Sequence, residues 1–172
     1  MGIPELIKLN NNFFVALQYH TLFLNRRLIL FLGDDKITVL KVGNMLADQH
    51  PTSNLANIVL KDMQVRDDRL NALNYIQNSY QTKYQNFSKL DKEILSVDNV
   101  NFELNYGDIL KIRKNTSWKW GMGSVPYTGR IHIKTKSKKY EFIVLGNQDI
   151  NVIYTSIFNK INAQNTASTP LS

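Results

Sequence analysis

The side chains best able to bind a charged partner are concentrated in residues 109–139. This segment holds nine Lys or Arg and no Asp or Glu, whereas the rest of the chain holds twelve Lys or Arg and fourteen acids. One His and two Trp lie among the cations. Clustered cations attract anions, and Trp rings favour lipid interfaces or stack on nucleic-acid bases. The net charge of +7 therefore comes from one segment, which is the candidate binding site.

Alternation within this segment separates apolar from cationic side chains. Ile131 and Ile133 share one face of a predicted strand, and Leu110 and Ile112 share one face of another. Antiparallel pairing of the two strands would bring the cations together on the outer face of a sheet. The candidate anion-binding or lipid-binding residues are Lys111, Arg113, Lys119, Arg130, His132, Lys134 and Lys136. Such a face either attracts an anionic partner or is a solvated face screened by salt, and both interpretations stay open.

The sequence allows two alternative placements of Trp118 and Trp120, buried or exposed. A strand that continued unbroken from residue 109 would point both rings inward, and burial at one end of a barrel is the interpretation that we favour. Polar residues interrupt the apolar face, however, and a bulge could reset the register. The two rings would then form a loop tip with Lys119 and Met122 that reaches a lipid interface.

Catalytic and metal-binding patterns are missing from the sequence. The chain has no Cys, which excludes disulfides and thiol catalysis. His20, His50 and His132 are scattered and lack metal-ligand spacing. The Gly-rich segment 121–129 lies between two predicted strands, whereas phosphate-binding loops precede a helix. We therefore predict that the protein is not an enzyme and uses no cofactor or metal.

Strands are predicted on both sides of a helical region. Residues 13–17, 21–32 and 36–42 are rich in aromatic and β-branched residues. Period-two alternation returns in residues 102–106, 109–114, 130–136 and 140–145. Together these segments predict seven strands in two groups.

Two helices are predicted from apolar spacing. The first has a stripe that faces its own domain, made of Leu70, Leu73, Ile76, Tyr80, Tyr84 and Phe87. The second closes the chain, with isoleucines at positions 150, 153, 157 and 161 and with Asn147 and Asp149 as capping candidates. We expect one domain over residues 1–162, a helical insertion at 44–92 and a disordered tail at 163–172.

The order of elements resembles that of pleckstrin-homology-like (PH-like) proteins of bacteria and archaea. Three segments carry the resemblance: "LFLGDDKITVLKVG", "EILSVDNVNFELNYGDILKIRK" and "GRIHIKTKSKKYEFIVL". The resemblance covers roughly residues 20–43 and 93–162 and implies an α+β fold, a barrel of about seven antiparallel strands closed by a C-terminal helix. In the wider superfamily, loops at one barrel end often bind phosphoinositides or proteins. The phosphoinositide pattern of the first strands is not recognisable here.

Three binding hypotheses follow. The first is a non-enzymatic PH-like module that engages an anionic membrane surface or a protein partner through the 109–139 hairpin. The second is nucleic-acid binding, with phosphates on the cations and bases on the Trp rings. The third is self-assembly into a homo-oligomer through strand edges and the helical insertion. The sequence lacks a signal-peptide pattern and a bilayer-spanning apolar run, so we expect a cytoplasmic protein with peripheral membrane association as an option.

Overall fold

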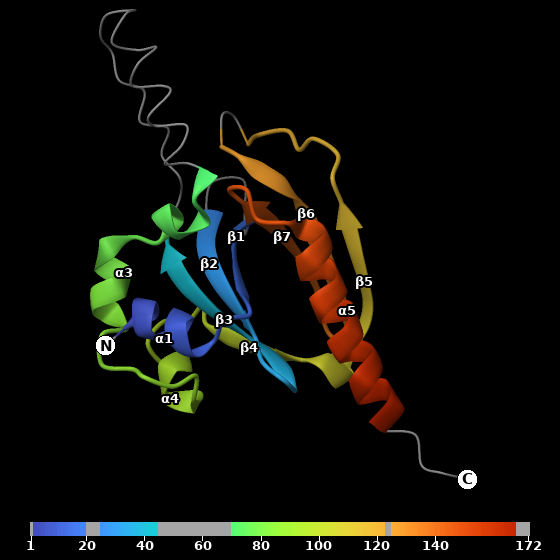
Figure 1. Cartoon of the computed structure of the whole chain (residues 1–172), viewed down its shortest axis with the longest axis horizontal. Helices are drawn as coiled ribbons and strands as arrows, with labels where there is room; N and C mark the ends of the chain where they lie inside the picture. The colour runs from blue at the N-terminus through green and yellow to red at the C-terminus, as the bar shows by residue number, and fades with distance from the viewer. Residues whose placement is uncertain (1, 20–24, 45–69, 123–124, 168–172) are drawn as a thin grey trace, which may run out of the picture.

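A computed structural model of the protein describes residues 2–19, 25–44, 70–122 and 125–167 (Figure 1). Within these residues, seven antiparallel strands form one curled sheet in the order β4-β3-β2-β1-β7-β6-β5. The strands are β1 Phe13–Tyr19, β2 Asn25–Leu32, β3 Lys36–Gly43, β4 Phe102–Asn105, β5 Ile109–Asn115, β6 Tyr127–Thr135 and β7 Lys139–Leu145. The α+β class and the seven predicted strands are confirmed.

A C-terminal helix, α5 (Ile150–Ala167), covers the concave face of the sheet (Figure 1). The four isoleucines of its predicted stripe are buried in one cluster with the inward side chains of the strands. Asp149 caps the helix, because its carboxylate accepts hydrogen bonds from the backbone N–H groups of Asn151 at 2.8 Å and Val152 at 3.4 Å. The closing helix and its cap are as predicted.

α5 continues past residue 162, where we expected a disordered tail to begin. Gln164 donates a hydrogen bond at 2.9 Å to the carboxylate of Asp35 in the β2–β3 turn. Residues 163–167 are therefore helical, and residues 168–172 of the predicted tail lie outside the described residues.

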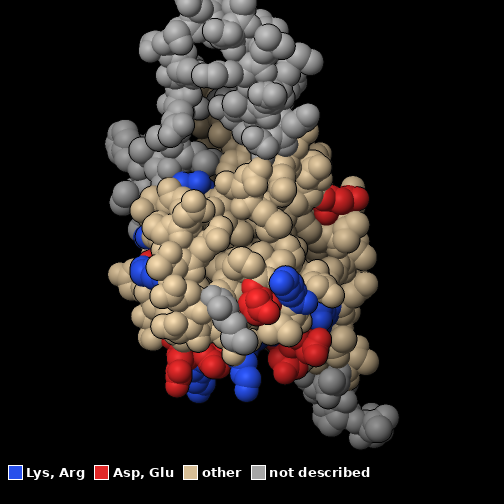
Figure 2. Space-filling model, turned by 60° about the vertical axis from the view of Figure 1, so that its left-hand side comes forward, with Lys and Arg blue, Asp and Glu red and all other residues tan. Residues whose placement is uncertain are grey.

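A second apolar cluster covers the convex face of β1, β2 and β3. It is built from α1 (Ile3–Leu9), the 3-10 helix η1 (Ala72–Tyr75), α3 (Asn78–Lys83) and α4 (Lys92–Leu95). These strands are therefore buried on both faces: Phe14 belongs to the inner cluster and Val15 to the outer one, and both are fully buried. Figure 2 brings this side forward and shows a largely uncharged surface, with Lys or Arg beside Asp or Glu along one rim.

The helical region differs from its prediction. The single helix expected over residues 70–87 is broken, because Ile76 and Gln77 have extended backbones and the N–H of Gln77 donates to the end of β3 at 2.9 Å. The break rotates the buried face, so that Leu73 of the predicted stripe is 39% exposed while Tyr75 is buried. α1 was not predicted. Residues 45–69, which hold most of the predicted insertion, lie outside the described residues.

The curled sheet consists of two half-sheets that meet at a short junction. The first half-sheet is β4-β3-β2-β1 and the second is β7-β6-β5, with the 3-10 helix η2 (Tyr106–Asp108) linking β4 to β5. β1 pairs with β2 through seven residue pairs, but with β7 only through Ala16–Val144 and Leu17–Ile143. None of the described helices is both long and apolar enough to cross a bilayer.

Candidate functional site

The basic segment forms β5, the following loop, β6 and the start of β7. In β6, Ile131 and Ile133 are at most 1% exposed within the inner cluster, as the alternation predicted. The residues between and beside them, Arg130, His132 and Lys134, therefore have outward parity. The predicted cationic face of this strand is thus formed.

In β5, a bulge changes part of the predicted pattern. The register shifts between Ile109 and Lys111, so that Ile109 is buried and Leu110, predicted to face inward, is 58% exposed. Ile112 packs against the inner cluster, and Arg113 stays on the outer face opposite β6. Lys111 and Arg113 therefore lie on the outer face, as predicted, whereas Leu110 does not lie on the inner face.

Like charges lie directly opposite one another across these strands. Lys111 pairs with Lys134 between β5 and β6, and Lys134 pairs with Lys139 between β6 and β7, whereas Arg113 lies opposite the imidazole of His132. Like charges directly across a sheet repel, so these pairs cost stability unless an anion neutralises them.

Two acids that flank the basic segment neutralise three candidate cations. The carboxylate of Glu141 accepts hydrogen bonds from Lys119 at 2.8 Å and from Arg130 at 3.2 Å, and Asp108 binds Lys136 at 3.1 Å. Burial raises the pKa of Glu141, but the hydrogen bond and charge of Lys119, aided by Arg130, outweigh it and hold that pKa below its usual value. Sequence reasoning missed both acids because they lie just outside the segment.

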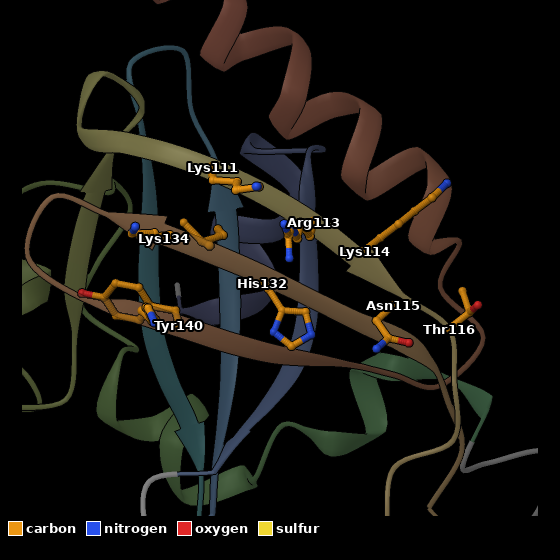
Figure 3. Close-up of a pocket in the computed structure, with 10 residues that line it drawn as sticks. Lys111, Arg113, Lys114, Asn115, Thr116, His132, Lys134 and Tyr140 are labelled. Atoms are coloured by element: carbon orange, nitrogen blue, oxygen red, sulfur yellow. The ribbon is translucent and has the colours of Figure 1, made fainter.

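Four of the six remaining cations form what we call the basic face: Lys111, Arg113, Lys134 and Lys139. None of the four has an ion-pair partner among the residues that the structure describes. They line an open hollow of about 690 Å³ together with His132. Figure 3 shows Lys111 and Arg113 on β5 next to Lys134 and His132 on β6.

His132 lies at the centre of this hollow as a neutral group at pH 7. Burial lowers its pKa, the nearby Glu141 raises it, and the charges of Arg130, Lys119 and Arg113 lower it further. Lys114 leaves the basic face for α5, where its ammonium binds the side chain of Asn151. The site therefore holds one histidine among lysine and arginine side chains.

Trp118 and Trp120 are exposed, by 67% and 81%. The favoured interpretation, burial of both rings, is therefore wrong, because the strand ends at Asn115 and the loop turns back over the sheet. The hydroxyl of Tyr19 donates to the carbonyl of Gly121 at 3.2 Å and holds this loop. Met122, expected at the exposed tip, is instead 3% exposed in the outer cluster.

Residues 116–122, which we call the Trp loop, lie on the same side of the sheet as the basic face. Tyr19 in β1 and Glu141 in β7, which bind the loop, have the outward parity of Leu17 and Ile143 in the outer cluster. The ammonium of Lys119 lies 5.0 Å from the centre of the Tyr19 ring and also binds Glu141. The loop that carries the two exposed indoles is therefore anchored on the face of the sheet that also carries the four cations.

The arrangement offers ammonium and guanidinium donors to several anionic groups at once. Among the residues in the described ranges, no three His, Asp or Glu gather to hold a metal ion, and His20 and His50 lie outside these ranges. Comparison of the chain with protein-family models, with curated proteins and with solved structures finds no match.

Proposed function

We propose that the protein is a PH-like binding module that docks on anionic lipid membranes through the basic face and the Trp loop. The PH-like assignment is supported by the curled antiparallel sheet and the helix that covers its concave side. It also agrees with the sequence resemblance over both groups of strands. The membrane assignment is supported by the charges and the two rings, taken in turn below.

The cations favour an extended anionic surface. Each Lys or Arg close to an anionic leaflet contributes about 1 kcal/mol, so the four cations of the basic face set a ceiling of roughly 4 kcal/mol. Their attraction decays over a Debye length of roughly 8 Å at physiological salt. Binding by this face alone is therefore weak and falls as salt rises.

The exposure of Trp118 and Trp120 is the observation that carries the proposal. Trp rings are large and amphipathic, and they are enriched where one side of the ring is apolar and the other is wet. Trp118 and Trp120 flank Lys119 in the sequence, a combination that suits the headgroup region of a bilayer. Membrane contact would bury surface that the fold leaves in water.

The test uses Trp fluorescence, because the chain contains only these two Trp residues. We expect the emission to shift to the blue with vesicles rich in phosphatidylglycerol and to stay unchanged with pure phosphatidylcholine. Absence of a shift with anionic vesicles at low salt would overturn the proposal. A shift or quench produced only by a single-stranded oligonucleotide would replace it with the nucleic-acid hypothesis.

Charge-neutralising variants sharpen the test. Lys111→Gln with Arg113→Gln removes two cations of the basic face and should cost about 2 kcal/mol of binding, roughly a thirty-fold loss of affinity. Lys8→Gln with Lys92→Gln makes the same change in net charge at two exposed positions in α1 and α4. Equal losses in both variants would mean that net charge, not the basic face, drives binding.

A further inference from the structure

The junction between the half-sheets is occupied at one end and open at the other. Beyond Ala16, the side-chain amide of Gln148 accepts a hydrogen bond from the N–H of Val15 at 2.9 Å and donates to its carbonyl at 2.8 Å. The amide of Gln148 therefore replaces one strand residue. Beyond Leu17, no residue pair joins the two strands, although β1 continues to Tyr19 and β7 begins at Lys139.

Backbone groups without a strand partner among the described residues face the open end. Peptide groups of alternate residues point to the same edge of a strand, and those of Val15 and Leu17 point towards β7. The same parity directs the N–H and C=O of Tyr19 towards β7, and those of Glu141 towards β1. In a continuous sheet these two residues would pair, so the ladder between β1 and β7 stops one hydrogen-bonded pair short of them.

A cavity of about 510 Å³ fills the space between the diverging strands. It is lined by Gln18 and Tyr19 of β1, by Lys139, Tyr140 and Glu141 of β7, and by residues 99–102. The ring of Phe102 stacks on that of Tyr140 with centroids 5.2 Å apart. The opening is therefore a slot with strand edges as walls and an aromatic base.

Two cations that are not part of the basic face line this slot. Arg26 and Lys138 have no carboxylate partner among the residues in the described ranges, and the ammonium of Lys138 lies 5.4 Å from the centre of the Tyr140 ring. Arg26 pairs with Gln18, and both residues have the parity of the inner cluster, so their side chains point to the concave side of the sheet. Lys139 lines both the slot and the hollow of the basic face.

We propose that the slot binds an extended peptide segment of a protein partner that carries Asp or Glu. The peptide would add to the edge of β1 through the backbone of Tyr19, which is the strand-addition mode of peptide recognition. A carboxylate directed inward would meet Arg26 and Lys138. This site shares Lys139 with the basic face, but Arg26, Lys138 and the edge of β1 do not belong to that face, and the proposal does not rest on membrane docking.

The experiment uses the full chain labelled with ¹⁵N and observed by NMR. The probe is a pool of capped nine-residue peptides with Glu at every second position and mixed uncharged residues between. One control pool has Lys in place of Glu, and another keeps Glu but has an N-methylated backbone. We expect the acidic pool to shift the amides of Tyr19 and Glu141, and both controls to bind at least ten-fold more weakly.

Crossed variants separate this site from the membrane site. Arg26→Gln with Lys138→Gln should weaken peptide binding at least ten-fold and leave binding to phosphatidylglycerol vesicles nearly unchanged. Lys111→Gln with Arg113→Gln should do the reverse. The proposal is overturned if the acidic pool shifts no amide, if the shifts lie only in β5 and β6, or if the N-methylated pool binds equally well.

Discussion

The two half-sheets are built from the same kind of alternating strand, yet β1 to β3 of the first are covered on both faces, whereas no helix of the described residues covers the outer face of β5 and β6 in the second. Outward residues of β1 to β3, such as Val15, Ile29 and Phe31, are apolar and lie under α1, η1, α3 and α4. Outward residues of β5 and β6, such as Arg113 and Lys134, are charged and exposed. Apolar burial stabilises the fold, whereas a bare row of like charges does not. The outer face of β5 and β6 is the surface that we propose docks on anionic membranes.

The largest expected effect is the loss of stability when a buried outward side chain of β1 to β3 is truncated. Phe31→Ala removes an outward ring that is 1% exposed, and truncation of a buried Phe typically costs about 3–5 kcal/mol. Arg113→Ala, also outward but exposed and unpaired among the described residues, should change the free energy of unfolding by less than about 0.5 kcal/mol. Urea unfolding of both variants measures the contrast, and similar losses would contradict it.

The difference between the halves explains how far the sequence could be interpreted. Local alternation and the isoleucine spacing predicted the strands and the closing helix, because one buried face leaves a period in the sequence. The break at Ile76 and Gln77 follows from a hydrogen bond to the end of β3, and the role of Gln148 follows from contacts with Val15, which is far away in the chain. Such distant partners leave no local pattern.

The sequence predicted one part of the candidate site, the strand β6, better than the other part, the strand β5 and the loop that follows it. The parity of β6 is visible in the sequence, so its cations were placed correctly. The bulge at Leu110 and the turn that exposes Trp118 depend on how β5 meets β6 and the loop meets Tyr19. The neutralising role of Glu141 would have been visible if the search for acids had extended two residues beyond the segment.

The second expected effect concerns the junction that joins the two halves. Gln148→Ala leaves the N–H and C=O of the buried Val15 without these partners, and an unsatisfied buried polar group costs roughly 1–3 kcal/mol. The exposed Gln85→Ala is the control and should be nearly neutral. Thermal unfolding measures both. A neutral Gln148→Ala would show that the half-sheets hold together without this amide.

The smallest expected effect is a pH dependence of vesicle binding by the basic face, caused by His132. Burial, with the nearby cations, lowers the pKa of His132 below its ordinary value of 6.5, so the imidazole is neutral at pH 7. An anionic surface against the basic face stabilises the protonated form and therefore raises this pKa. Proton uptake accompanies binding, so affinity for phosphatidylglycerol vesicles should rise a few-fold as the pH falls from 7 to 5.5.

The free energy of unfolding of the unbound protein should change in the opposite sense. The lowered pKa of His132 gives stability that is present above the ordinary pKa and is lost as the pH falls through the pKa of the folded state. His132→Asn should remove both dependences, and vesicle titrations at several pH values, each paired with an unfolding curve, measure them. A pH dependence of vesicle binding that persists in His132→Asn would assign it to another group and leave His132 without a part in binding.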